Sequence, residues 1–254
     1  MAVGSGEHDQ TSLRGRTLVN RGVYVVAYGV HARQCANELI RTIHSQMSGI
    51  PVCLASDNPL GVEDVFAYSK QQDAGARWQK TRVWSMAPDD WGQVLYLDAD
   101  ILLARNVGVV FEILSDGWDM VMTTSPPQSP AIRDAQRAEY RVENAYTVQA
   151  LGSDRYPQLA GGVWAFQRNT RTRQFFKLFH QEWERFGLRD QQAMDRALYE
   201  APVRVWVLGR EFNWFMHHDI PNDEVHVMHF ATAARDWVVK HKGRDLWLDW
   251  RKRV

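Results

Sequence analysis

The fold is decided by the stretch Leu95-Tyr96-Leu97-Asp98-Ala99-Asp100-Ile101-Leu102. Its apolar start continues a run from Val94, and a short unbroken apolar run predicts a strand buried on both faces of a parallel sheet. Side chains alternate along an extended chain, so Asp98 and Asp100 point the same way. Ligands bind at the carboxyl ends of strands in such sheets, and we therefore expect a functional site at these two aspartates.

Strands and helices alternate on the amino-terminal side of this stretch. Residues 22–28 and 51–55 predict buried strands. The helix expected between them carries apolar residues at helical spacing, namely Cys35, Leu39, Ile40, Ile43 and Met47. A second helix is expected over 74–87. This order predicts an α/β fold, a single domain with a mostly parallel, Rossmann-like central sheet and flanking helices.

The second half of the chain continues the same pattern. We expect a helix over 109–114 and strands over 120–124, 159–166, 203–208 and 225–230. Aromatic residues at helical spacing predict a core-packed helix that Gly187 ends, and these are Phe175, Phe179, Trp183 and Phe186. Asp190 can cap a further helix. The polar stretch 125–157 predicts irregular structure, either over the mouth of the site or as a surface insertion without function.

Composition limits the partners of the protein. Thirty basic and thirty acidic residues cancel, which argues against nucleic acid as the main partner. No apolar run approaches the ~20 residues of a membrane-spanning helix, and the first residues lack the apolar stretch of a secretory signal. We therefore expect a cytoplasmic protein without a transmembrane segment. Cys35 and Cys53 are too few for a disulfide framework and are expected to be buried thiols.

The two ends of the chain differ from the rest in composition. Residues 1–20 predict a flexible polar tail. Residues 241–254 form a basic segment that contains Trp247 and Trp250. A solvated terminal helix is the preferred interpretation of this segment, and contact with a membrane surface or an acceptor is the alternative.

The two aspartates after the apolar strand predict a cation. Like charges at one strand end repel, and a hard divalent ion such as Mn²⁺ or Mg²⁺ is the simplest group to offset that repulsion. An Asx turn or a helix cap that uses one carboxylate is the alternative. His229 is the candidate third ligand, because alternation along 225–230 places it on one face of a late strand. A core histidine with satisfied hydrogen bonds is the competing interpretation.

Six motifs follow one another between residues 22 and 237. They are 24–28, Lys80-Thr81, 95–102, 160–163, Asp190-Gln191 and 229–237. The set resembles the glycogenin-like (family 8) glycosyltransferases, a group that includes galactinol synthases and bacterial lipopolysaccharide hexosyltransferases. This resemblance implies a GT-A type domain over 21–240, a UDP-sugar as donor, Mn²⁺ (or Mg²⁺) as cofactor, and transfer of a hexose with retention of configuration.

The resemblance also implies roles for individual residues. Asp98, Asp100 and His229 match the metal ligands. Asp190 matches an aspartate near the anomeric carbon of the donor, and Gln191 supports it. The positions that match donor-binding residues, including the uridine loop 27–33, are Ala27, Tyr28, Arg33, Arg77, Lys80, Asp98, Ala99, Gly161, Gly162 and Arg235.

Two segments depart from the family pattern. Ala160 stands where the family has an asparagine that orients the donor sugar, which leaves the identity of the donor open. Thr232, Arg235 and Asp236 replace a glycine, a lysine and a proline, although Arg235 can still neutralise a β-phosphate. The acceptor is also open and can be a glycan, a lipid, a small molecule or a protein. The oligomeric state is open as well, a homodimer included.

Two other functions compete with glycosyl transfer. A sugar nucleotidyltransferase also uses carboxylate-bound Mg²⁺, but it favours a glycine-rich loop after the first strand, and 29–33 contains one glycine. A sugar-nucleotide-binding or carbohydrate-binding protein without catalysis is consistent with the eleven tryptophans and with Ala160. The acidic residues and His229 weigh against this second alternative.

Overall fold

The structure of the chain is a computed structural model that describes residues 20–68, 75–124, 138–156, 158–216 and 223–230. Several sequence predictions fall outside the described residues, namely the tail over 1–19, the basic segment 241–254, Arg235 and Trp237. None of the described helices is both long and apolar enough to cross a membrane. Cys35 and Cys53 are buried, as expected, and no disulfide joins them.

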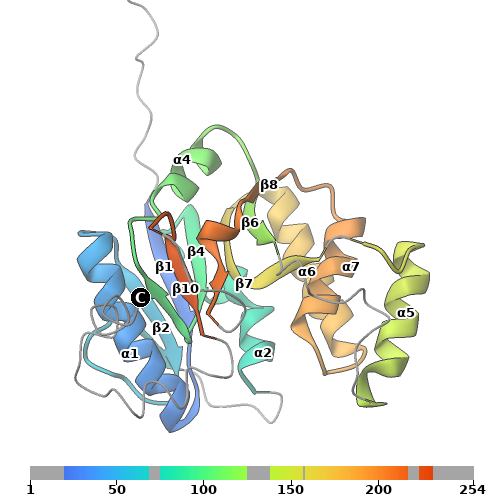
Figure 1. The fold of residues 1–254 in the computed structure, drawn as a ribbon, viewed down its shortest axis with the longest axis horizontal. Helices are drawn as coiled ribbons and strands as arrows, with labels where there is room; N and C mark the ends of the chain where they lie inside the picture. The colour runs from blue at the N-terminus through green and yellow to red at the C-terminus, as the bar shows by residue number, and fades with distance from the viewer. Residues whose placement is uncertain (1–19, 69–74, 125–137, 157, 217–222, 231–254) are drawn as a thin grey trace, which may run out of the picture.

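A seven-stranded sheet forms the centre of the molecule (Figure 1). Its members are β1 (Arg21–Val26), β2 (Val52–Ser56), β3 (Val65–Tyr68), β4 (Gln93–Asp98), β6 (Met120–Thr124), β7 (Leu159–Gln167) and β8 (Val205–Leu208). They are ordered β3-β2-β1-β4-β7-β6-β8. Only β7 runs antiparallel to its neighbours, and the other pairs are parallel. The predicted mostly parallel sheet is therefore confirmed.

A second, three-stranded sheet lies beside the large one. It is ordered β5-β10-β9, from β5 (Ile101–Leu103), β10 (Val227–His229) and β9 (Trp214–Phe215). The chain leaves the large sheet at Asp98 and enters the small one at Ile101. Asp98 and Asp100 therefore lie at the junction between the two sheets.

Two apolar layers cover the two faces of the large sheet. On one face, Val23 and Val25 of β1 share a core with α1 (Gly29–Gln46) and α4 (Val109–Ser115). On the other, Tyr24 of β1 shares a core with α3 (Val83–Met86), α6 (Thr170–Glu184) and α7 (Asp190–Glu200). Figure 1 shows α1 beside β1 and β2, with α5 (Arg141–Leu151), α6 and α7 together on the opposite side. Each fully buried Leu or Phe contributes about 1.5–3 kcal/mol, which makes these layers the main source of stability.

The aromatic residues of α6 lie where helical spacing predicts them. Phe175, Phe179 and Trp183 are buried in the second layer. The helix begins with a capping box, in which the Asn169 side chain accepts from the backbone N–H of Thr172. These aromatic side chains are consequently core residues and do not form a stacking surface.

The helix expected over 74–87 was a wrong prediction, because the structure has two short helices there. They are α2 (Gly75–Lys80) and α3. The N–H of Arg82 donates to the carbonyl of Gln79 at 3.0 Å, and the Thr81 hydroxyl donates to the carbonyl of Trp78 at 2.8 Å. These contacts tighten the turn and separate the two helices.

The irregular structure expected over 125–157 was also a wrong prediction for its second half. A 3₁₀ turn, η2 (Ala138–Tyr140), leads into α5 (Arg141–Leu151), which ends at Gly152 with a left-handed φ of 67°. The buried face of α5 is mostly polar and consists of Glu143, Asn144, Thr147 and Leu151. Apolar periodicity therefore carries little sign of this helix.

Candidate active site

A pocket of about 310 Å³ opens where β1 and β4 end. Its walls are Val26, Ala32, Cys35, Ala76, Arg77, Lys80, Tyr96, Asp98, Ala99, Asp100 and Asp190. The sequence predicts a ligand site at this edge, and the described residues do bring six of the predicted site residues to one pocket: Arg77, Lys80, Asp98, Ala99, Asp100 and Asp190.

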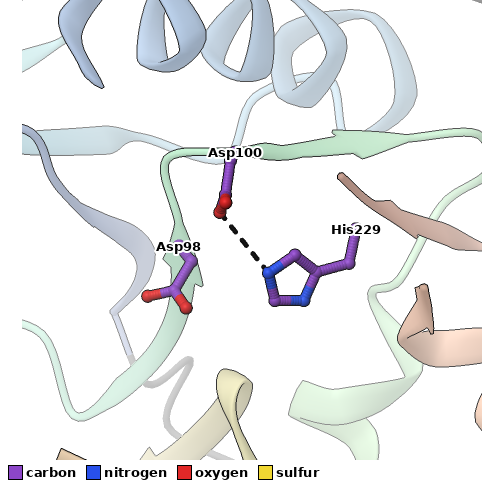
Figure 2. Close-up of side chains that lie close together, drawn as sticks. All are labelled: Asp98, Asp100 and His229. Carbon is purple, nitrogen blue, oxygen red and sulfur yellow. Dashed lines mark ion pairs between the residues drawn. The ribbon is translucent and has the colours of Figure 1, made fainter. Parts of the chain in front are cut away.

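Three candidate metal ligands converge from separate elements. Asp98 ends β4, Asp100 lies in the turn before β5, and His229 ends β10 opposite Ile101. One ligand atom from each of the three lies within 4.8 Å of the other two. Figure 2 shows the side chains around a common space, with the Nε2 of His229 3.4 Å from an oxygen of Asp100. Two carboxylate oxygens and an imidazole nitrogen form a donor set that can hold a divalent cation.

The orientation of His229 leaves one ring nitrogen for a ligand. Its Nδ1 lies 2.9 Å from the side-chain oxygen of Asn213, and its ring stacks on Phe215 with 4.4 Å between centroids. An amide oxygen only accepts, so Nδ1 donates to Asn213, while Nε2 points toward Asp100. His229 is thus partly satisfied as a core histidine, yet its second nitrogen faces carboxylates.

The ammonium group of Lys80 joins two carboxylates of the pocket. Its Nζ lies 2.7 Å from an oxygen of Asp190 and 3.0 Å from an oxygen of Asp98. Burial alone would lower the pKa of Lys80, but Asp190 and Asp98 outweigh burial and raise it. Burial likewise would raise the pKa of Asp190, but Lys80 outweighs it and the pKa is lowered. Both groups therefore stay charged at neutral pH.

Carboxylates outnumber cationic groups around the pocket. Asp98, Asp100 and Asp190 line it together with Lys80 and Arg77. Arg77 is half exposed, lies 3.7 Å from Asp190, and also donates to the carbonyl of Leu188. The excess of carboxylates around a small pocket favours an additional cation.

A bulge in β7 lies beside two of the candidate metal ligands, Asp98 and His229. In its pairing with β6, Trp164 faces Met122 but Ala160 faces Thr123, so the register shifts between them. The freed carbonyl of Gly161 accepts from the indole N–H of Trp164 at 2.9 Å. A Cβ on Gly162 would lie 2.6 Å from the His229 ring and 2.9 Å from an oxygen of Asp98. Glycine is therefore required at 162 for the three ligands to meet.

Gln191 contacts β7 instead of lining the pocket. Its side-chain oxygen accepts from the N–H of Gly161 at 3.0 Å, and its amide group donates to the carbonyl of Leu159 and to Asp195. Both ends of the side chain are thus held by the protein. A role for Gln191 in catalysis stays a prediction, whereas its contact with the bulge is present in the structure. Asp190, in turn, is the first residue of α7 rather than its N-cap, which is Arg189.

The segment 27–33, predicted to be a uridine-binding loop, is helical from Gly29, where α1 begins, and its named side chains do not line the pocket. Ala27 is fully buried, with its N–H bonded to the carbonyl of Ala55, and Tyr28 is packed in the core. Arg33 pairs with Asp57 at 2.5 Å. Their roles in donor binding stay predictions, as do those of Gly161 and Gly162. The pocket wall here is formed by Val26, Ala32 and Cys35.

Sequence reasoning missed two residues that contact the candidate ligands. The Tyr96 hydroxyl donates to an oxygen of Asp98 at 2.7 Å, and Asn213 bonds His229. Burial raises the pKa of Tyr96, so the phenol keeps the proton that it donates. Alternation along β4 places Tyr96 on the face of Asp98 and could have identified it. Asn213 carries no comparable signal, because it precedes the two-residue strand β9.

Sequence comparison finds no protein-family model and no curated protein that matches the chain. Structural comparison does find similar solved structures. One is WbbM, a bifunctional glycosyltransferase in its apo form, with TM-score 0.64 and 11% identity over 95% of this chain and 53% of the WbbM chain. Another is the galactosyltransferase LgtC in complex with donor and acceptor sugar analogues, with TM-score 0.56 and 14% identity over 92% of this chain and 96% of LgtC.

These likenesses establish the fold. The chain spans about half the length of WbbM and nearly all of LgtC. At such low identity the shared feature is the arrangement of elements, a central mostly parallel sheet with flanking helices. The expected GT-A type α/β fold is thereby confirmed.

Proposed function

We propose that this chain is a metal-dependent hexosyltransferase, similar to the glycogenin-like group, that uses a UDP-sugar donor and retains the anomeric configuration. The observation that supports the proposal is the convergence of Asp98, Asp100 and His229 at a pocket that also contains Lys80 and Asp190. This set occurs within the fold of known glycosyltransferases.

The three converging side chains would hold Mn²⁺ or Mg²⁺. The Nε2 of His229, which points toward Asp100, and the space left by Gly162 fit such an ion. When bound, the cation supplies positive charge to the diphosphate of the donor.

Lys80 and Asp190 would act on opposite charges of the transition state. Lys80 is a buried, charged ammonium group, so it stabilises negative charge that develops on the departing diphosphate. Asp190 keeps a charged, partly buried carboxylate beside it, which stabilises positive charge at the anomeric carbon or orients the acceptor hydroxyl. Arg77 at the pocket, and Arg235 outside the described residues, would add positive charge for the phosphates.

Attack on the same face as the leaving group accounts for retention. The bond from the anomeric carbon to the β-phosphate oxygen breaks, and a bond to the acceptor oxygen forms on that face. The acceptor proton moves to a phosphate oxygen of the departing UDP. Asp190 is a poor candidate for a covalent nucleophile, because its carboxylate is already paired with Lys80 at 2.7 Å.

Donor hydrolysis tests this function without knowledge of the acceptor. We expect purified protein to release UDP from at least one of a panel of UDP-hexoses in the presence of Mn²⁺, and to stop when the metal is chelated. Pyrophosphate release from UTP and a sugar phosphate would instead indicate a nucleotidyltransferase. Metal-dependent binding of UDP by calorimetry, without turnover of any donor, would indicate a binding protein and contradict the proposal.

A further inference from the structure

We infer that Tyr96 is a positioning residue that leaves Asp98 a single free oxygen, and that it thereby makes the site prefer a small cation such as Mn²⁺ over Ca²⁺. The inference depends on the metal site of the proposed function. Nothing in the motifs assigns a role to this tyrosine.

The oxygen Oδ1 of Asp98 is already occupied by two donors. The Tyr96 hydroxyl donates to it at 2.7 Å, and the Lys80 ammonium donates to it at 3.0 Å. Lys80 also contacts Oδ2, but at the longer distance of 3.4 Å. A carboxylate oxygen accepts about two such bonds. Oδ2 is therefore the oxygen that remains for a cation, and it faces Gly162 and the ring of His229.

The phenol of Tyr96 is held in place by its surroundings. Its ring stacks on Trp164 with centroids 4.5 Å apart and planes 16° apart. The Nζ of Lys80 lies 5.1 Å from the centroid of the same ring. Tyr96 is 2% exposed, so its hydroxyl has little freedom to turn away from Asp98. A fixed donor on Oδ1 fixes the carboxylate as well.

Cation size follows from the number of oxygens that Asp98 offers. Ca²⁺ takes six to eight oxygen ligands and often binds both oxygens of a carboxylate, whereas smaller ions accept fewer ligands at shorter distances. Two-oxygen ligation by Asp98 requires Oδ1 to give up its bond to Tyr96. The hydroxyl of Tyr96 therefore lowers the affinity for Ca²⁺. It does not affect a smaller ion that binds one oxygen of Asp98.

The chain offers a matched pair of variants. Tyr96→Phe removes the hydroxyl and keeps the ring against Trp164. Tyr24→Phe is the control, because Tyr24 pairs with Tyr96 across β1 and β4 and is equally buried. Among the described residues, the Tyr24 hydroxyl has no hydrogen-bond partner. Only the first substitution removes a contact of Asp98.

The experiment measures Mn²⁺ binding to the full chain by the loss of the free-ion paramagnetic resonance signal, with Ca²⁺ as competitor and thermal unfolding as a check of the fold. We expect Tyr96→Phe to weaken Mn²⁺ binding roughly tenfold, which is the lower end of the range for losing a hydrogen bond to a metal ligand. The ratio of Mn²⁺ affinity to Ca²⁺ affinity should fall as well. Tyr24→Phe should leave affinity and preference unchanged.

The two ways of failing are distinct. An unchanged Mn²⁺-to-Ca²⁺ preference in Tyr96→Phe, with normal Mn²⁺ binding by the wild type, overturns the role of Tyr96 and leaves the proposed function standing. An equal change in Tyr24→Phe also overturns it, since packing would then be the cause. A wild-type chain that does not bind Mn²⁺ removes the metal site and both proposals together.

Discussion

Helix α7 takes part in two clusters of buried charge that differ in what surrounds them. Asp190, at its start, belongs to the pocket cluster with Lys80 and Asp98. Arg196, farther along, belongs to a triad with Glu143 of α5 at 3.3 Å and Glu182 of α6 at 2.7 Å.

The side chains of the triad are enclosed by protein partners, whereas those of the pocket cluster border a cavity. Arg196 is 1% exposed, and it also donates to the hydroxyl of Thr147 and the carbonyl of Glu182. The guanidinium group is thus surrounded by acceptors on two helices, α5 and α6. The carboxylates of the pocket instead face a cavity. The difference teaches that buried charge with a full set of partners stabilises the fold, while an excess of one sign beside a cavity indicates a ligand site.

Asp100→Ala should show most strongly that the pocket cluster serves activity and the triad serves stability. Loss of a metal ligand removes several kcal/mol of transition-state stabilisation, so we expect Mn²⁺-dependent donor hydrolysis to fall by ~10³-fold or more. The free energy of unfolding should stay within about 0.5 kcal/mol, because the change also removes a like charge beside Asp98. Turnover and urea unfolding measure the two effects, with the exposed Asp89→Ala as control. Full turnover by Asp100→Ala would refute the proposed site.

Arg196→Ala should give the opposite result. Glu143 would remain buried without its cation and Glu182 would keep only its pair with Arg185, so we expect the free energy of unfolding to fall by ~3–5 kcal/mol. Arg185→Ala is the matched control, since Arg185 pairs with the same Glu182 but is 54% exposed. That surface pair should contribute about 0–1 kcal/mol. Equal effects of the two variants in urea unfolding would show that the triad is not a stabilising unit.

The loss of stability caused by Lys80→Met should depend on pH. The folded pKa of Asp190 is lowered, so its contribution is present above its unfolded value near ~4 and is lost as pH falls through the folded value. Without Lys80, buried carboxylates lack their partner, and we expect a deficit of ~3 kcal/mol at pH 7. The deficit should shrink toward pH 3, where the carboxyl groups take up protons.

The measurement for Lys80→Met is urea unfolding of wild type and variant at both pH values. Exposed Lys177→Met serves as control and should show little difference at either pH. A deficit that is the same at pH 7 and pH 3 would mean that the ion pairs of Lys80 do not stabilise the fold.

Gly162→Ala should lower the free energy of unfolding by about 1–3 kcal/mol, because a methyl group is forced against His229 and Asp98. Mn²⁺ affinity should fall as the ligands are pushed apart. Gly161→Ala is the control and should have a smaller effect on Mn²⁺ affinity, since its added Cβ would meet Lys80 and Gln191 at 3.4 Å. Resonance titration with Mn²⁺ compares the two, and equal affinities would argue against close convergence at Gly162.

The large sheet and the core of the site could be predicted from the sequence because both follow from simple periodicity. The apolar run before Asp98 identified β4, and alternation identified the face of His229 on β10. The direction of β7 could not be predicted, since an antiparallel and a parallel strand have the same apolar pattern. β3, β5 and β9 have two to four residues each, too few to show a period.

The remaining differences between prediction and structure occur where contacts between polar side chains, and not apolar periodicity, determine the local structure. The buried face of α5 is polar because Arg196 supplies its partners. Arg33 is drawn to Asp57 by an ion pair that no local pattern predicts. Likewise, the role of Gln191 in holding the bulge depends on residues 30 and 32 positions away. Such long-range polar contacts are known only once the chain is folded.

The placement of Asp98 in one sheet and of Asp100 and His229 beside the other has a mechanical consequence. An ion bound to all three would cross-link the two sheets at the turn that joins β4 to β5. Resistance to heat would then rise with the concentration of free cation, by mass action. Chelators would weaken first the short strands β9 and β10, whose attachment to the rest of the protein that ion completes.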